Sequence, residues 1–508
     1  MEEDLKDITT NVDNLKIDET PPKQSIISSL KTNIESEDYI KEIRVAVIGN
    51  VDSGKSTLVG CLTKNIKDDG RGFARQYVFN YQHESETGRT SSIAEEILGY
   101  KNHKSVDLGR INEKKNIAWK EIADKSDSVI TLLDLCGHEK YLKTTMYGLT
   151  GLLPDYAIIL IGTNMGVQRM TKEHLGIVIS LNVPFFIVFT KIDIAPKDIK
   201  EKTVNTFVNL LTNGLKKTVK NVGSIDEAIV NAKEIINNEI VPIFQISTVT
   251  GEGLDYLKTF LGYLIPRHYK NSMNMVIKSP KDKTEMLLDS AFNTKVGIIY
   301  AGVLTSGFLK VGQKVAMGPM MDGSFKTVQI KSIQFLRCDV NEIKCGNSCS
   351  VKLKSLEKGY ELTTDNFKKG MVLVDIENHL DPAEIFEIEG LIVHHSSTIK
   401  VGYQSVIHCN VVRQTATIIG MDKEFMRAGD NGTIKFKFIK KPEYLHLGDI
   451  VLFREGRTRG KGKITKIYPF NVKTFNEEKK KMFEKKRINQ MKRNNMIKTS
   501  KNNKNNKK

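Results

Sequence analysis

The feature that most constrains this fold is a glycine-rich turn between an apolar run and a segment that suits a helix. Residues 43–48 lead into Gly49-Asn50-Val51-Asp52-Ser53-Gly54-Lys55-Ser56, and residues 57–62 follow. A strand, G-x-x-x-x-G-K-S and a helix in this order are the context that gives the motif its meaning. Its glycines let backbone N–H groups converge on phosphate oxygens at a helix N-terminus, where the dipole also favours an anion. A chance glycine turn is the alternative, and both flanking segments speak against it.

This loop predicts a nucleoside triphosphate with Mg²⁺ as the ligand. Lys55 is expected to reach the β- and γ-phosphates, and the Ser56 hydroxyl is expected to ligate Mg²⁺. The residues that we expect around the phosphates are Asn50, Val51, Asp52, Ser53, Gly54, Lys55, Ser56 and Thr57.

Because ATPases share this loop, the base has to be identified from a second motif. Thr190-Lys191-Ile192-Asp193 follows an apolar run at 185–189, where ligand-binding loops of an open α/β sheet lie. The Asp193 carboxylate can accept bonds from guanine N1–H and the N2 amine, a donor pair that adenine lacks. Each such bond contributes about 1.5–3 kcal/mol, so guanine is predicted. Lys191 is expected to lay its apolar stem along the base. Thr190 stands where this motif usually has Asn, so one contact is expected to be lost or replaced.

A further loop is expected to meet the γ-phosphate. Asp134-Leu135-Cys136-Gly137-His138 follows an apolar run at 129–133. Asp134 is expected near Mg²⁺, and the Gly137 N–H near the γ-phosphate. Loss of that phosphate would release the loop, which makes it a candidate switch. His138 is the predicted catalytic residue because it is placed to orient or polarise the attacking water. A surface histidine without a role is the alternative.

Two hydroxyl-rich segments complete the predicted site. Thr90 is the candidate Mg²⁺ ligand of a first switch segment, switch I, and the adjacent Ser91 and Ser92 are alternatives. Ser247-Thr248, after an apolar run at 241–246, is expected to hold the guanine O6 through backbone amides. The predicted metal ligands are Ser56, Thr90 and Asp134.

Apolar runs alternate with helix-compatible stretches between residues 40 and 268, and the Lys-rich part between 193 and 241 reads as surface helices. Runs without a polar face are typical of parallel strands buried between helices. After Pro266, short strands with glycine turns indicate β-barrels. We therefore predict an α/β fold: a P-loop GTPase domain with a doubly wound, mostly parallel sheet, followed by two β-barrel domains. The predicted ranges are 1–39 for a disordered acidic arm, 40–268 for the GTP-binding domain, 269–380 and 381–474 for the barrels, and 475–508 for a disordered basic Lys/Asn-rich tail.

Charge is distributed unevenly along the 508 residues. Residues 1–39 hold 4 Lys against 10 Asp and Glu, and residues 476–508 hold 13 Lys and Arg against 3 Glu. Since the whole chain has a formal charge of +17, residues 40–475 keep +13. A basic folded region suits phosphate-rich partners such as RNA. A general bias toward Lys is the alternative.

The six cysteines form no CxxC pair and have no zinc-ligand spacing, so we expect reduced thiols. The N-terminus has no basic segment followed by an apolar one, and no apolar run reaches about 18 residues. We expect a cytoplasmic monomer with no membrane partner.

These motifs together resemble the translational GTPases of the elongation factor Tu and elongation factor 1-alpha superfamily, over residues 40–474. The P-loop is similar to the family's G-H-V-D-H-G-K-[ST]-T, and Asp134 to His138 is similar to D-C-P-G-H with Leu and Cys at its middle. By this resemblance, Val51 forms one side of a hydrophobic gate around the catalytic histidine, and Asp52 helps to hold a monovalent cation. The segments 87–92, 134–145 and 454–460 are most similar to the GTP-binding protein 1 and 2 group.

The resemblance implies a translation factor that binds GTP or GDP with Mg²⁺, binds aminoacyl-tRNA and hydrolyses GTP when the ribosome triggers it. Members of the GTP-binding protein 1 and 2 group are linked to ribosome surveillance and mRNA turnover. Two alternatives stay open. One is a release- or rescue-type GTPase that carries a release-factor-like protein, and the other is the GTPase subunit of a nucleotide-transferring enzyme such as ATP sulfurylase.

Overall fold

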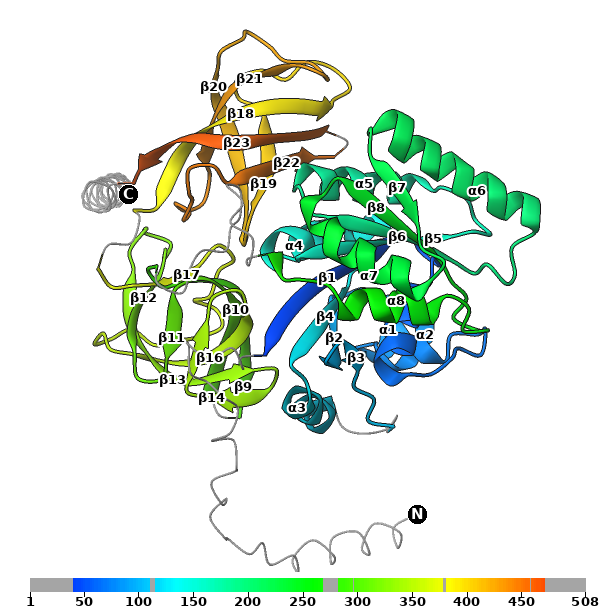
Figure 1. The fold of residues 1–508 in the computed structure, drawn as a ribbon. Helices are drawn as coiled ribbons and strands as arrows, with labels where there is room; N and C mark the ends of the chain where they lie inside the picture. The colour runs from blue at the N-terminus through cyan, green and yellow to red at the C-terminus, as the bar shows by residue number, and fades with distance from the viewer. Residues whose placement is uncertain are drawn as a thin grey trace, which may run out of the picture.

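The computed structural model describes residues 40–109, 115–267, 282–295, 297–377, 381–456 and 458–470. The predicted acidic arm at 1–39 and the predicted basic tail from 475 lie outside these ranges. An α/β unit comes first along the chain, and two all-β units follow and lie on one side of it (Figure 1). We refer to the predicted ranges 40–268, 269–380 and 381–474 as the G domain, the first barrel and the second barrel.

The G domain is built on an eight-stranded sheet. β1 pairs in parallel with β4 and β5, the order continues in parallel through β6, β8 and β7, and β2 runs antiparallel to β4 at the other edge. Each apolar run predicted to be a strand overlaps one of these strands, although the run 241–246 extends one residue beyond β8. The order across the sheet is β3 (Lys104–Ser105), β2 (Ala94–Lys101), β4 (Ser128–Asp134), β1 (Lys41–Gly49), β5 (Tyr156–Gly162), β6 (Phe185–Thr190), β8 (Ile240–Gln245) and β7 (Thr218–Asn221).

Helices cover both faces of this sheet, as the prediction of a doubly wound domain requires. Alternate residues of β1 enter different cores: Val45 and Val47 join the core of α1 and α8, whereas Ala46 and Ile48 join the core of α4 and α5. The α-helices are α1 (Lys55–Lys64), α2 (Gln82–Thr87), α3 (Lys115–Lys125), α4 (Leu142–Gly151), α5 (Arg169–Ser180), α6 (Lys197–Asn209), α7 (Ile225–Glu234) and α8 (Leu254–Gly262). Shorter helical turns are η2 (Ala74–Tyr77), η3 (Glu139–Tyr141), η4 (Leu210–Gly214) and η5 (Ile235–Asn237).

The first barrel closes because β12 pairs with both β17 and β13. Its strands are β9 (Glu285–Thr294), β10 (Gly297–Ser306), β12 (Lys314–Gly318), β13 (Lys326–Phe335), β14 (Cys338–Val340), β16 (Ser348–Ser355) and β17 (Val372–Val374), and β11 (Phe308–Lys310) pairs separately with β15 (Glu342–Lys344). The second barrel is a closed ring of β18 (Ala383–His394), β21 (Asn431–Phe438), β20 (Val412–Met421), β19 (Gln404–Cys409), β22 (Ile450–Glu455) and β23 (Thr458–Pro469). The predicted fold class is therefore confirmed.

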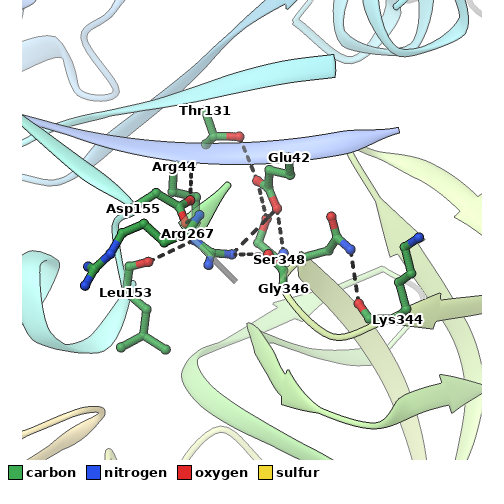
Figure 2. Close-up of polar contacts among 10 residues, drawn as sticks. Glu42, Arg44, Thr131, Leu153, Asp155, Arg267, Lys344, Gly346 and Ser348 are labelled. Atoms are coloured by element: carbon green, nitrogen blue, oxygen red, sulfur yellow. Dashed lines mark hydrogen bonds and ion pairs between the residues drawn. The ribbon is translucent and has the colours of Figure 1, made fainter. Parts of the chain in front are cut away.

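Buried polar side chains join the G domain to the first barrel where β1 begins (Figure 2). The Glu42 carboxylate accepts the N–H of Ser348 at 2.6 Å and the Thr131 hydroxyl at 2.7 Å. The Arg44 guanidinium donates to the carbonyl oxygen of Gly346 at 3.2 Å and lies 3.7 Å from Glu42. Because both charged side chains are almost fully buried, this seam fixes the barrel against the central strand of the sheet.

Ionic contacts fix the second barrel to both neighbours. Glu173 on α5 is buried and pairs with Arg454 on β22 and Arg459 on β23. Between the two barrels, His446 Nε2 lies 2.8 Å from the Glu285 carboxylate at the start of β9. The two barrels and the G domain thus form one body with a three-way junction.

All six cysteines are free thiols with buried side chains. Among the described residues, no helix is both long and apolar enough to cross a membrane.

Candidate functional site

The predicted site residues follow strands that end at the same edge of the G-domain sheet. The P-loop follows β1, Asp134 ends β4, Thr190 ends β6 and Ser247 comes shortly after β8. Because these strands are parallel, their carboxyl ends meet at one edge, which is where ligands bind in such sheets.

The P-loop has the tight backbone that a phosphate cradle needs. Gly49 has φ 152°, and a Cβ there would lie 2.5 Å from the carbonyl oxygen of Leu160 on β5. Gly54 has φ 86° and directly precedes α1. Both positions therefore require glycine. The loop also holds its own lysine, since Lys55 Nζ donates to the carbonyl oxygen of Asn50 at 2.7 Å. Burial lowers the pKa of Lys55, while the nearby Asp134 carboxylate opposes this shift.

Ser56, Thr90 and Asp134 converge from three separate segments. The Ser56 hydroxyl donates to Asp134 Oδ2 at 2.6 Å and lies 2.8 Å from Thr90 Oγ1, which is 3.4 Å from the same carboxylate oxygen. Asp134 is fully buried, and its second oxygen, Oδ1, has no partner in the described part of the chain. Burial raises the pKa of Asp134 to about 6. Two hydroxyls beside an unsatisfied buried carboxylate form a hard oxygen donor set, which fits Mg²⁺.

The loop after β4 brings a glycine and a histidine to the P-loop. A Cβ on Gly137 would meet Lys55 Nζ and would lie 2.8 Å from the Gly49 carbonyl oxygen, so only glycine fits here. His138 is exposed at the mouth of the cavity, and its Nδ1 accepts the N–H of Lys140 at 3.1 Å. Because Nδ1 accepts this bond, the proton of the neutral imidazole is on Nε2.

Thr190 links the predicted guanine loop to the P-loop. Its hydroxyl is buried and donates to the carbonyl oxygen of Ser53 at 2.8 Å, which ties the predicted guanine loop to the P-loop. The Thr163 hydroxyl in turn donates to the Thr190 carbonyl oxygen at 2.8 Å. The sequence did not indicate whether the contact of the usual Asn would be lost or replaced. In the structure, the Thr190 hydroxyl forms a link between the guanine loop and the P-loop.

The remaining base-site candidates occupy turns on the same edge. Asp193 is exposed in the turn after β6, and Lys191 has φ 61° there. The Ser247 hydroxyl accepts the N–H of Val249 at 3.2 Å, which rigidifies the turn after β8. β6 and β8 are neighbours, so both turns lie side by side.

A cavity of about 460 Å³, counting solvent at its open mouth, lies over the P-loop. Two arginines that line it were not predicted as site residues. Arg75 donates to the carbonyl oxygen of Gly88 at 3.3 Å, and Arg89 directly precedes Thr90. The position of Arg89 was a usable signal, whereas nothing in the sequence near Arg75 indicated its place. The lining residues are Val51, Asp52, Gly54, Lys55, Ser56, Thr57, Arg75, Gly88, Arg89, Thr90, Gly137 and His138.

Comparison with known proteins identifies relatives of this chain. A family model described as "Elongation factor Tu GTP binding domain" matches residues 41–292. GTP-binding protein 1 of Xenopus laevis is 42% identical over 440 residues, which cover 86% of this chain and 65% of that protein. GTP-binding protein 2 of Homo sapiens is 37% identical over 448 residues, which cover 87% of this chain and 72% of that protein. The chain thus spans about two thirds of the length of these relatives.

A solved structure shares the three-part fold. The crystal structure of a bacterial selenocysteine-specific elongation factor superposes with a TM-score of 0.60 at 17% sequence identity, covering 88% of this chain and 62% of that one.

Proposed function

The chain belongs to the translational GTPase family, in the group of GTP-binding proteins 1 and 2, and we propose that it binds Mg²⁺ with GTP, carries aminoacyl-tRNA and hydrolyses GTP on the ribosome. The observation that carries this proposal is the convergence of Ser56, Thr90 and Asp134 beside the P-loop lysine, under an exposed histidine.

The nucleotide is held from both ends in this proposal. Glycine-rich backbone and Lys55 bind the phosphates, and Asp193 accepts the guanine donors while Lys191 lies along the base. Turns after β6 and β8 present these groups, and the Thr190 hydroxyl keeps them in register with the P-loop. Ser56, Thr90 and Asp134 would hold Mg²⁺, and the ion would offset the negative charge of the phosphates.

His138 orients the water that attacks the γ-phosphate. Because its Nδ1 accepts the Lys140 N–H, the protonated Nε2 is free to point toward the cavity mouth as a donor. Val51 lines the same cavity and supplies the apolar side against which the ring rests before activation. Catalysis by this chain is therefore positioning and polarisation of a water, without a covalent intermediate.

A basic junction supports a nucleic-acid cargo. Burial lowers the pKa of His408 to about 3, and the positive charges of Arg413 on β20, Lys143 on α4, Arg454 on β22 and Lys369 before β17 add to this shift. Basic side chains from all three domains thus act on one buried histidine, and a tRNA backbone near this junction would meet positive charge. Because aminoacyl-tRNA is delivered to the ribosome, the ribosome is the partner in this proposal. The protein is proposed to act as a monomer in the cytoplasm.

The test is GTP hydrolysis by the purified chain with and without ribosomes, for wild type and His138→Ala. Ribosomes should raise the wild-type rate, and His138→Ala should lose that stimulation by on the order of 10²–10⁴-fold while still binding a GTP analogue. A wild-type rate that ribosomes leave unchanged would overturn the ribosomal role and would favour a nucleotide-transferring enzyme subunit.

The cargo is tested separately by the deacylation rate of aminoacyl-tRNA. With a nonhydrolysable GTP analogue the protein should slow deacylation, and with GDP it should not. Ribosome-stimulated hydrolysis without protection would overturn the tRNA cargo. Capture of a release-factor-like protein by the GTP form would then identify a protein cargo.

A further inference from the structure

One buried carboxylate lies inside the first switch segment. Glu84 on α2 is 0% exposed, although its helix neighbours Ser85 and Glu86 are exposed. An acidic side chain is almost never fully buried unless its oxygens have donors. The contacts of Glu84 therefore carry information about what this segment does.

Six hydrogen bonds end on this carboxylate. Oε1 accepts the N–H groups of Ser91 and Ser92 at 2.6 and 3.0 Å, and their hydroxyls at 2.9 and 3.1 Å. Oε2 accepts the N–H groups of Asn80 and Tyr81 at 3.0 and 3.3 Å. One side chain thus joins the chain entering α2 to the loop at 88–93, which we call the switch I loop.

We infer that Glu84 is the positioning residue that sets Thr90 against Ser56 and Asp134, and this inference rests on the proposed function. Thr90 is bonded directly to Ser91, so fixing the Ser91 N–H fixes the peptide group that follows Thr90. The hydroxyl of Thr90 lies 2.8 Å from Ser56 Oγ in this arrangement. Ser91 and Ser92 are thereby committed to Glu84, which leaves Thr90 as the hydroxyl of the three that faces the metal ligands.

The charge on Glu84 suits this role. Burial by itself would raise the pKa of Glu84, but the N–H and hydroxyl donors of Ser91, with those of Asn80 and Ser92, outweigh it and hold the pKa below its ordinary value. The carboxylate is therefore ionised at neutral pH and binds its donors as a charged acceptor, which roughly doubles the strength of each bond.

A glutamine cannot replace this carboxylate. Its amide has one acceptor oxygen and one NH₂ donor. If the oxygen meets Ser91 and Ser92, the NH₂ group points at the N–H groups of Asn80 and Tyr81, and the opposite rotamer sets it against the switch I loop. A donor faces donors in either case, so Glu84→Gln opens the loop without changing side-chain size.

The test compares full-length wild type, Glu84→Gln and the control Glu86→Gln, which alters an exposed glutamate on the same helix. We expect Glu84→Gln to raise the Mg²⁺ concentration for half-maximal GTP hydrolysis, and to lower kcat, each by on the order of 10–100-fold. GDP affinity should stay near wild type, which a merely structural role would not allow. With a GTP analogue, trypsin should cut after exposed Arg89 faster in Glu84→Gln than in the other two proteins.

A second variant covers the case in which Glu84→Gln does not fold. Ser91→Ala with Ser92→Ala removes the two hydroxyl donors and keeps the backbone donors, so a smaller shift in the same direction is expected. Wild-type hydrolysis with unchanged Mg²⁺ dependence in these variants would overturn the inference and leave the proposed function standing. A wild type that neither binds nor hydrolyses GTP would overturn the proposed function itself.

Discussion

The carboxylate of Glu42, on the first strand of the G domain, accepts both the backbone N–H and the hydroxyl of Ser348 in the first barrel (Figure 2). These residues are 306 positions apart in the chain. Their contact is part of the buried seam that also holds Arg44 against Gly346. The contact of the second barrel with Glu173 differs from this seam, because its arginines are partly exposed.

Removing one donor of the seam should weaken the whole fold. Ser348→Ala deletes the hydroxyl that lies 2.7 Å from Glu42 Oε1 and leaves a buried carboxylate short of a partner. The expected loss is about 1–3 kcal/mol of unfolding free energy, measured by urea denaturation. Ser350→Ala on the same strand is the matched control, because its side chain does not contact Glu42. Equal effects of both substitutions would contradict a special role for the seam.

Thr190 should contribute to nucleotide affinity through its hydroxyl alone. Thr190→Val keeps the shape of the side chain but loses the 2.8 Å bond to the Ser53 carbonyl oxygen, so the guanine loop and the P-loop lose their link. A bond of this kind contributes about 0.5–1.5 kcal/mol, which predicts a GTP affinity about 2–10-fold weaker. Thr190→Ser retains the hydroxyl and should bind as wild type does. Both affinities can be measured by titration with a fluorescent GTP analogue.

Asp193 should decide which base is accepted. Asp193→Asn replaces one acceptor oxygen by a donor, which opposes the guanine N2 amine and suits a base with a carbonyl there, as in xanthine. With about 1.5–3 kcal/mol for a bond to a charged group, GTP affinity should fall by about 10–100-fold and XTP affinity should rise. Competition between the two nucleotides measures this. A variant that loses affinity for both would show that Asp193 supports the turn and does not read the base.

The strands that are buried on both faces of the sheet were the easiest elements to predict from the sequence. β1, β4, β5, β6 and β8 are buried on both faces, so they appear as continuous apolar runs, and the loops after them could be assigned to one sheet edge. The edge strands β3 and β7, and β2 beside β3, were missed. β7 reads Thr-Val-Lys-Asn and is mostly exposed, so the stretch between residues 193 and 241 was predicted as helices only.

Contacts between distant segments could not be predicted in the same way. Glu84 and Glu42 look like surface glutamates in the sequence, because their burial depends on donors that only the folded chain supplies. Thr190 shows the intermediate case. Its position predicted an altered contact, but the identity of the acceptor, Ser53 of the P-loop, required the structure.

The contact between the two barrels predicts a specific dependence of stability on pH. Burial by itself lowers the pKa of His446, but hydrogen bonds to Asp449 and Glu285 outweigh it and raise this pKa to about 9. The ordinary value of 6.5 applies to the unfolded chain. Because the folded value is the higher one, protonation of His446 stabilises the folded state. That stabilisation is fully present below pH 6.5 and is lost as the pH rises through about 9.

The measurement is the thermal midpoint of wild type and His446→Gln between pH 6 and 10. Subtracting one from the other removes the titration of lysines and tyrosines elsewhere, which both proteins share. The Tyr444 hydroxyl, 3.5 Å from Glu285, faces the same pair in both proteins. The advantage of wild type should be largest at pH 6 and should shrink toward pH 10. A difference that is constant with pH would mean that His446 joins the barrels by packing and not by its charge.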